Sequence, residues 1–441
     1  MSESQVRMLK MCLEYLSYLD DQVPVSEIQA RFPLARYSAQ YWMDHAKPVE
    51  IEKDVQERVL DFFLHRDRAY RVWGNLYDFD VVSFCLNDRP PLAAPVYYAS
   101  LAGLQRTVEL LLKEDVDVNA EGGILGHALQ AASWGGHKKI VQLLLQGGAD
   151  VNAKGGLYDN ALRAASDQGH KGIVELLLQG GAHVNAQCGL YGNALQNASA
   201  NGNKEVVQVL LERGADVNAQ CGHYGNALQA ASHGGNEGVV RVLLERGADV
   251  NAQCDHYGTA LQAASDGGHK KVVQVFLERG ADVKAEGGYH RNALQAACHE
   301  GHAEVVQILV ARGAEVNAQS SQCANALSVA SCRGCREIVE VLLERGVDVN
   351  AQGDEEFSNA LQAACVAGNE EIVQLLLESG AEVNRQGGYY RNALQAACHG
   401  GHTEIVQLLL ARGADVIAQG NCFWTMVLTD MGCNFSDCCK H

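Results

Sequence analysis

The sequence is short of several features, and each shortage narrows what the protein can do. It has no run of about 18 apolar residues, and its opening stretch, MSESQVRMLK, lacks a charged segment followed by an apolar one. Neither a membrane-spanning helix nor a secretory signal is therefore expected. Lysine and arginine number 35 against 53 aspartate and glutamate residues, for a formal net charge of −18. This deficit of positive charge argues against binding to nucleic-acid phosphates or to an anionic membrane.

The motifs that commonly carry catalysis are missing as well. The chain has no G-x-x-x-x-G-K-[ST] loop, no Gly-Lys pair, no G-x-S-x-G and no H-E-x-x-H. The phrase CHEGH at residues 298–302 places its histidines three residues apart, which is not the metalloprotease spacing. We therefore expect no catalytic residues, no metal set and no cofactor. An enzyme or enzyme accessory that uses the N-terminal region or the cysteine-rich tail stays open as an alternative.

One phrase recurs along the chain at a fixed spacing. GHYGNALQAASHGG at residues 222–235 is nearly repeated from residue 190 and from residue 388. The leucine of each copy follows the last by 33 residues, with one step of 34, at Leu129, Leu162, Leu195, Leu228, Leu261, Leu294, Leu327, Leu361 and Leu394. Such a period indicates a solenoid of stacked units. The extra residue lies between Asn350 and Asn359 and marks a loop, because a helical insertion would rotate later side chains by about 100°.

The copy around Leu228 predicts two helices and a loop. Asn226 is a favourable N-cap for a short helix over residues 227–232, and the glycine pair after it supplies a turn. Gly247 is expected to end the second helix as a left-handed residue. The apolar stripe of that helix consists of Val239, Val240, Leu243 and Leu244. Histidines that recur in the turn are expected to hydrogen-bond the turn backbone: His137, His170, His269, His302 and His402.

The phrase GNALQAASHGGNEGVVRVLLERGADVNA resembles the ankyrin pattern G-x-TPLH-x-A-x-x-GH-x-x-V-V-x-LLL-x-x-GADVNA. Asn, Ala and Gln stand where the family has Thr, Pro and His of TPLH. The resemblance implies an all-α ankyrin-repeat solenoid of about ten 33-residue helix-turn-helix units, from Pro95 to near Gln419. The NALQ variant with a preceding Tyr is similar to the ankyrin arrays of fungal NACHT-type receptors. FPLARYSAQYWMDHA is similar to the helical tract before such arrays.

Three parts are expected along the chain. Residues 1–90 lack the period and should form four or five short helices that pack on the first repeat and cap the array. Ser26 is expected to begin one of these helices and Pro33 to end it. Another helix follows Pro48, with an apolar face of Ile51, Val55, Val59, Phe62 and Phe63. Residues 91–420 are the repeat array, and residues 421–441 are a cysteine-rich tail with a truncated capping unit.

The 15 cysteines are expected to be mostly reduced structural thiols. Cys188, Cys221 and Cys254 share one finger position in consecutive repeats. Units stacked about 10 Å apart cannot bring their Cα atoms within disulfide range. CRGC at residues 332–335 has redox or metal spacing, but it falls on the turn of the repeat and is interpreted as part of it. The tail cysteines lack the paired C-x-x-C pattern of a structural zinc site.

Two columns of residues, one member per repeat, are candidates for binding. The aromatic finger column comprises Tyr158, Tyr191, Tyr224, Tyr257, Phe357 and Tyr390. It is either a recognition stripe or a set of rings that pack on the next finger in place of the hydrogen bonds of TPLH. Variable residues at the exits of the first helices and at the finger tips are the candidate partner-binding residues: Trp134, Asp167, His223, His233, His256, Asp266, Tyr289, His299 and Tyr389. Trp134 is the best single candidate for an anchor.

These observations predict a non-enzymatic scaffold that binds another protein through its concave groove and finger loops. The alternative within the binding class is the ligand-sensing arm of a fungal NACHT-like immune receptor that lacks its NTPase module. The partner is expected to be a protein and not a nucleic acid or a membrane, and the chain is expected to be a monomer. The expected location is the cytoplasm, with the nucleus as the alternative.

Overall fold

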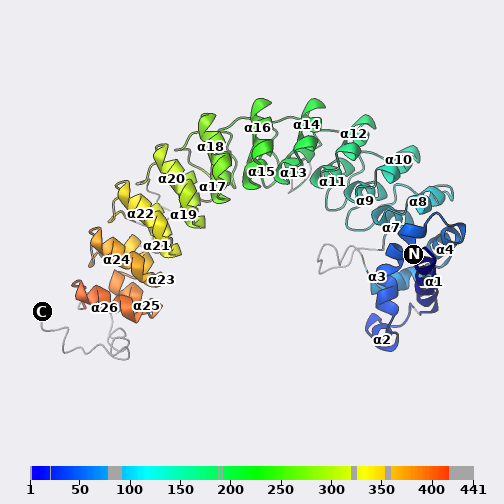
Figure 1. Cartoon of the computed structure of the whole chain (residues 1–441), viewed down its shortest axis with the longest axis horizontal. Coiled ribbons are helices and arrows are strands. Elements are labelled where there is room, and N and C mark those ends of the chain that lie inside the picture. The colour runs from blue at the N-terminus through cyan, green and yellow to red at the C-terminus, as the bar shows by residue number, and fades with distance from the viewer. Residues whose placement is uncertain are drawn as a thin grey trace. The chain divides into compact units, whose positions relative to one another are not determined.

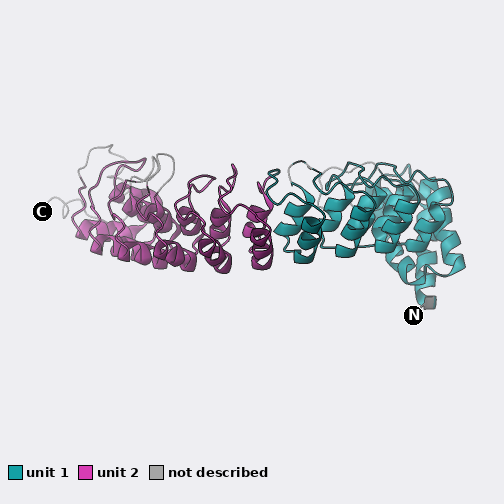
Figure 2. Ribbon diagram, turned by 90° about the horizontal axis from the view of Figure 1, so that it is seen from above, with its two compact units in different colours: residues 1–222 teal, residues 223–441 magenta. Residues whose placement is uncertain are grey.

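The computed structural model describes residues 2–19, 21–77, 92–186, 189, 192–318, 325–352 and 359–416. Within these ranges the protein is all-helical, with no strand and one isolated bridge between Cys254 and Gly258. The predicted all-α repeat fold is confirmed. The chain divides into two compact units, residues 1–222 and 223–441, which Figure 2 colours separately. The inserted residue near 353–358 and the tail of residues 421–441, with its capping unit, lie outside the described residues.

The first unit begins with a non-repeating group of helices and continues as helical pairs (Figure 1). The non-repeating helices are α1 (Ser2–Tyr18), α2 (Val25–Arg31), α3 (Ala35–Ala46), the 3-10 helix η1 (Lys47–Val49), α4 (Lys53–His65) and α5 (Asp67–Leu76). The pairs are α7 (Pro95–Ala102) with α8 (Gln105–Leu111), α9 (Ala128–Trp134) with α10 (Lys138–Gln146), α11 (Ala161–Asp167) with α12 (Lys171–Gln179), and α13 (Ala194–Ala200) with α14 (Lys204–Glu212).

The second unit consists of helical pairs throughout its described residues. They are α15 (Ala227–His233) with α16 (Glu237–Glu245), α17 (Ala260–Asp266) with α18 (Lys270–Glu278), α19 (Ala293–Glu300) with α20 (Ala303–Ala311), α21 (Ala326–Arg333) with α22 (Arg336–Glu344), α23 (Ala360–Ala367) with α24 (Glu370–Glu378), and α25 (Ala393–Gly400) with α26 (Thr403–Ala411). First helices contact first helices of the neighbouring pairs, and second helices contact second helices. The finger loops project from one edge of this unit (Figure 2). Helices α7 to α26 make ten pairs, in agreement with the predicted number of repeats.

The first helix of most pairs begins at the N-cap that the sequence predicted. In α15 the Asn226 side chain accepts a hydrogen bond of 2.9 Å from the Gln229 N–H, and the Gln229 side chain accepts one from the Asn226 N–H. Thr259 and Gln262 make the same exchange in α17. Each exchange satisfies two N–H groups that would otherwise lack a partner at the helix start. The glutamine of NALQ is therefore part of the cap.

The second helix of each pair buries an apolar face, with one correction to the predicted stripe. Val239, Val240 and Leu243 of α16 are buried as expected, and Gly247 follows the helix with a left-handed φ of +87°. Leu244 is only half-buried, whereas Val242 is buried. The buried face is shifted because α16 contacts both α15 and the next second helix, α18.

The same glutamine also joins each repeat to the next one. Gln262 Nε2 donates hydrogen bonds to the carbonyls of Ala285, Gly287 and Arg291 in the following finger, at 3.2, 3.2 and 2.8 Å. Equivalent bonds to the next finger are made by Gln130, Gln196, Gln229 and Gln362. One interpretation of the aromatic column was that its rings replace hydrogen bonds lost with the histidine of TPLH. That part of it is wrong, because glutamine makes inter-repeat hydrogen bonds from this position.

Asparagine and histidine columns add further bonds between repeats. Asn384 Nδ2 donates to the Gly413 carbonyl at 3.0 Å, and its Oδ1 accepts from the Asp415 N–H at 2.8 Å. His302 Nε2 bonds the Asp266 carbonyl, at the end of the preceding first helix, at 2.9 Å. The equivalent ring bonds are made by His137, His170, His269 and His402. The turn histidines thus bond backbone as predicted, but the acceptor belongs to the preceding repeat.

Replacing Gln262 by alanine is expected to lower the free energy of unfolding by about 1–3 kcal/mol, because backbone groups of the finger lose their donor. The finger of residues 285–291 should also lose protection from hydrogen exchange, which is the measurement. Gln374→Ala is the control, since Gln374 is exposed on α24 and bonds Glu378 of the same helix. Unchanged protection in Gln262→Ala would show that other contacts hold this finger.

The N-terminal helices pack on the first pair through aromatic side chains. The buried rings of Trp42 and Trp73 lie 5.9 Å apart between centroids, and Trp73 is edge-on to Tyr98 of α7 at 4.8 Å. Near the start of α8, the Thr107 N–H donates to a carboxylate oxygen of Glu50 at 2.6 Å. These contacts place the helices against the first repeat. That they cap the array, and that their part ends at residue 90, stay predictions.

Two details of the N-terminal region differ from expectation. Helix α2 begins at Val25 with Pro24 as its N-cap residue, so Ser26 lies inside the first turn and does not cap it. Ile51 precedes α4 and is 87% exposed, because the chain turns through η1 before α4 starts. The buried face of α4 consists of Val55, Val59, Phe62 and Phe63.

Candidate functional site: finger loops and helix exits

The finger column and the helix-exit column lie together, although nine residues separate their members in each repeat. In the second unit the ring centroids are 5.9 Å apart for Tyr224 and His233, 4.6 Å for His290 and His299, and 5.1 Å for Tyr390 and His399. A first helix of 7 or 8 residues is only about 10–12 Å long, so a ring just before its start can reach its end. The two sets of candidate residues therefore form one surface.

Rings of successive repeats also contact each other. Tyr224 and Tyr257 stack at 6.3 Å with an angle of 9° between their planes, and His233 lies 4.9 Å from Tyr257. These contacts favour packing between repeats as one role of the finger column. The rings stay half-buried, which leaves an edge of each accessible to a ligand. Two members of the column, Tyr191 and Phe357, lie outside the described residues.

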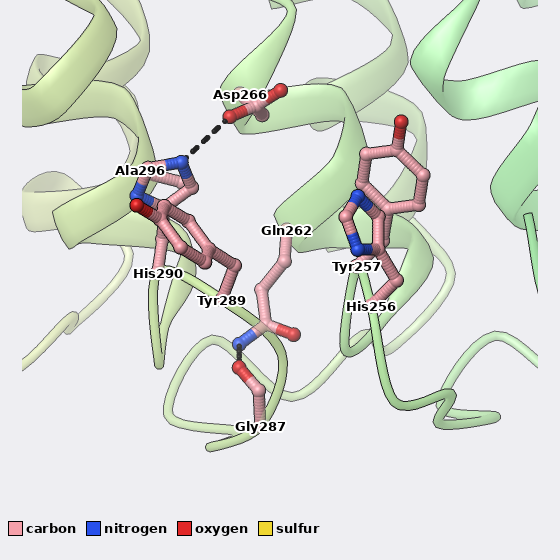
Figure 3. Close-up of a pocket in the computed structure, with 8 residues that line it drawn as sticks. All are labelled: His256, Tyr257, Gln262, Asp266, Gly287, Tyr289, His290 and Ala296. Atoms are coloured by element: carbon pink, nitrogen blue, oxygen red, sulfur yellow. Dashed lines mark hydrogen bonds and ion pairs between the residues drawn. The ribbon is translucent and has the colours of Figure 1, made fainter. Parts of the chain in front are cut away.

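A pocket of about 150 Å³ opens between two successive fingers of the second unit (Figure 3). It is lined by His256, Tyr257, Gln262, Asp266, Gly287, Tyr289, His290 and Ala296. His290 Nε2 lies 3.1 Å from Asp266 Oδ1 on one side, and the rings of His256 and Tyr257 lie on the other (Figure 3). Three candidate partner-binding residues thus share a pocket, His256, Asp266 and Tyr289. These residues come from two neighbouring repeats, so the sequence of a single repeat does not predict that they meet.

The finger tips carry the most exposed aromatic side chains of this surface. Tyr289 and Tyr389 are each 75% exposed. The His223 and His256 rings of neighbouring tips lie 4.1 Å apart, and the Tyr289 N–H donates to the His256 carbonyl at 2.9 Å. Backbone held in this way loses less conformational entropy when a partner binds. These tips are therefore suited to present aromatic side chains to another molecule.

Pairing and burial shift the pKa values of residues near the pocket. The hydrogen bond with His290 holds the pKa of Asp266 below its usual value. Burial lowers the pKa of His233 and raises the pKa of Tyr257. At neutral pH the surface thus combines a carboxylate with a neutral imidazole and a neutral phenol.

The candidates of the first unit are more enclosed. Trp134 is half-buried at the end of α9. Asp167 accepts hydrogen bonds from the Tyr158 hydroxyl at 3.1 Å and from Asn201 Nδ2 at 2.9 Å. The guanidinium of the buried Arg163 lies 5.6 Å from the Tyr158 ring centroid. Tyr158 thus contacts both Asp167 and Arg163, and Trp134 as an anchor stays a prediction.

The cysteines show no sign of activation in the residues that the structure describes. Cys221 and Cys254 are free thiols, while Cys188 lies outside those residues. Burial raises the pKa of Cys298 and of Cys335, which keeps both thiols protonated and weakly nucleophilic at neutral pH. Cys335 of CRGC occupies the position that the turn histidine has in other repeats, in agreement with the repeat interpretation of this motif.

One group of potential metal ligands was missed by sequence reasoning. His290, His299 and Glu300 bring their ligand atoms within 4.8 Å of one another. His290 lies in a finger, whereas His299 and Glu300 end α19, so the three residues form no recognised motif. His290 and Glu300 differ from the residues that most other repeats have at these positions, and this difference is visible in the sequence.

A family model described as "Ankyrin repeats (3 copies)" matches residues 128–221, 195–287, 284–353 and 353–420, more than half of the chain. The chain belongs to the ankyrin-repeat family. Ankyrin repeats are generally protein–protein interaction modules, and their fold is typically non-enzymatic. No helix in the described part of this ankyrin chain is both long and apolar enough to cross a membrane.

Two similar proteins can be named. The chain is 37% identical over 144 residues to "Azaphilone pigments biosynthesis cluster protein L" of Monascus ruber, a match over 28% of this chain and 30% of that protein. The chain thus spans less than a third of the length of this curated relative. The crystal structure of the human ASB11 ankyrin repeat domain is similar with a TM-score of 0.45 and 28% identity, over 50% of this chain and 98% of that chain.

Proposed function

We propose that this protein is a non-enzymatic scaffold that binds another protein through the fingers and first-helix exits of residues 223–441. The observation that supports this most is the exposed Tyr289 beside a pocket, on a finger held by Gln262. Protein interfaces concentrate binding energy in aromatic anchors next to well-packed pockets. At about 150 Å³ the pocket is smaller than the roughly 300–1,000 Å³ of small-molecule sites and suits one side chain of a partner.

The chemistry of the pocket favours a basic side chain of that partner. Asp266 supplies a carboxylate, and the rings of Tyr257 and His256 face it across the pocket (Figure 3). A lysine or arginine can pair with the carboxylate and place its charge over a ring. The formal charge of −18 adds long-range attraction for a basic surface.

Tyr289→Ala is expected to weaken partner binding by about 2 kcal/mol or more, roughly thirtyfold in Kd, with little loss of stability. The partner is first identified by affinity capture with the full chain from an extract of the source organism, and Kd is then measured by calorimetry. Tyr18→Ala is the matched control, because Tyr18 is 81% exposed and belongs to α1. Equal affinity of the Tyr289 variant and the parent protein would refute this interface.

The remaining candidates are members of the same two columns, and each is proposed to contact the partner from its own unit. In the second unit they are His223, His233, His299 and Tyr389, and in the first unit Trp134 and Asp167. We propose that the chain acts as a monomer in the cytoplasm, with the nucleus as the alternative, and that neither nucleic acid nor membrane is its target. Sedimentation velocity measures whether the chain is a monomer, and fluorescence imaging of the tagged chain measures its location in the cell.

Two other functions keep some support. The name of the Monascus relative refers to a biosynthesis cluster, which favours a role as an accessory to biosynthetic enzymes. Capture of an enzyme as the main partner, or turnover lost on mutation of the N-terminal helices, would support that role. The receptor-arm alternative depends on the expected resemblance of the NALQ repeats to NACHT-type receptor arrays. An intact P-loop upstream in the same gene would favour it.

A further inference from the structure

We propose that His290, His299 and Glu300 form a binding site for a divalent transition-metal ion, with Zn²⁺ as the natural occupant. The site goes beyond the proposed interaction with a protein partner. Two imidazoles and a carboxylate are ligands that zinc accepts, and three protein ligands leave a position open for water or another group.

The geometry of the three ligands supports the site. Their ligand atoms lie within 4.8 Å of one another, whereas ligands about 2.1 Å from one tetrahedral zinc ion are roughly 3.4 Å apart. Glu300 is exposed at the end of α19, so a rotation of its side chain can close this difference. Neighbouring helical residues normally point about 100° apart. Here His299 Nδ1 and Glu300 Oε1 are only 2.5 Å apart, so both side chains turn to the same place, and the rotation of Glu300 that admits an ion lengthens this contact.

Asp266 supplies the outer contact that a metal-binding histidine needs. Its Oδ1 lies 3.1 Å from His290 Nε2 (Figure 3). When Nε2–H donates to this carboxylate, the lone pair of the neutral ring is on Nδ1, which becomes the metal ligand. Asp266 is therefore a positioning residue that fixes the tautomer and the orientation of His290.

The other repeats of the chain serve as an internal comparison. At the position of His290 they have Tyr in most copies, and at the position of Glu300 they have Gly, Gln, Asn, Arg or Ala. The repeat with Tyr390 and His399 has a glycine, Gly400, in place of Glu300. At both positions the repeat of His290 and Glu300 has a potential metal ligand where other repeats have a different residue. Among the described residues, no other three His, Cys, Asp or Glu side chains bring their ligand atoms this close.

Arg333 is the main competitor for Glu300, and its contact leaves room for an ion. Its Nε donates to the His299 carbonyl at 2.8 Å, and a terminal nitrogen lies 3.8 Å from Glu300 Oε2. That separation exceeds hydrogen-bond distance, and the other carboxylate oxygen, Oε1, faces His299. The positive charge of Arg333 is offset by the carboxylate of Glu300.

Titration of the full-length reduced protein with Co²⁺, followed by visible absorption, tests the proposal. Cobalt substitutes for zinc and separates nitrogen and oxygen ligation from thiolate ligation, which adds an intense charge-transfer band at shorter wavelength. We expect one equivalent of Co²⁺ to give d–d bands without thiolate charge transfer. His299→Ala and His290→Gln should each abolish these bands, and Asp266→Asn should weaken affinity by about 10- to 100-fold.

His399→Ala is the matched control, because His399 occupies the position of His299 in the repeat with Tyr390 and Gly400. It should leave Co²⁺ binding unchanged, and circular dichroism should show the same helical content in all variants. Bands with thiolate charge transfer, bands that survive the double change His290→Gln/His299→Ala, or no binding at all would overturn the site. Unchanged affinity in Asp266→Asn would overturn the role of Asp266.

Discussion

Trp73→Ala is expected to lower the free energy of unfolding of the N-terminal part by about 3–5 kcal/mol, the usual cost of removing a buried aromatic ring. Trp73 is 0% exposed and packs against Trp42 and against Tyr98 of the first repeat. Its indole N–H also donates to the Ala39 carbonyl at 2.9 Å, and the change leaves this buried acceptor without that donor.

The helices that lose stability in Trp73→Ala show whether the N-terminal region caps the array or folds as an independent module. Each repeat of an array contacts only the neighbouring repeats. The helices α7 and α8 should therefore lose hydrogen-exchange protection, while α25 keeps it. Ile51→Ala is the control within the same region, since its side chain is 87% exposed, and should change stability by less than about 0.5 kcal/mol. Full protection of α7 and α8 in Trp73→Ala would mean that the N-terminal helices do not stabilise the array.

Leu228→Ala is expected to destabilise the second unit by about 2–5 kcal/mol, because the change leaves a cavity among tightly packed helices. Leu228 is 1% exposed on α15, which contacts α16 and α17. A long array need not unfold in a single step, so hydrogen exchange across α15 to α18 is the preferred measurement, together with urea denaturation.

A second leucine of the same repeat provides the comparison for Leu228. Leu244 has the same side chain on α16 but is only half-buried, so Leu244→Ala should cost clearly less. The two substitutions remove the same atoms and differ in the burial of the site. Equal losses in the two variants would contradict the burial that the structure assigns to them.

Much of the fold follows from the local pattern of the repeat. The spacing of Leu228 and its counterparts, the N-cap at Asn226 and the left-handed Gly247 each act within one repeat, and all three predictions are confirmed. The predicted stripe was wrong at Leu244, because the position of the buried face depends on how neighbouring helices contact α16. Ile51 was misplaced for a similar reason, since a turn ahead of α4 removes it from the helical face.

The sequence named several residues of the candidate surface but did not predict how they are arranged. Finger and exit residues were chosen as two separate columns, and the structure brings Tyr224 close to His233 because the helix between them is short. The pocket between His256 and Tyr289 needs two fingers, which no single repeat contains. The donor role of Gln262 also crosses from one repeat to the next.

By itself the sequence determined the helical class, the repeat length, the caps and the residues that vary from repeat to repeat. These depend on backbone preferences and side-chain periodicity over a few residues, which local chemistry decides. Only the tertiary structure decided which variable residues meet, such as Asp266 with His290 and His290 with His299. Such pairs join residues of successive repeats, or of a finger and a helix end. Their distances depend on how neighbouring repeats pack against each other.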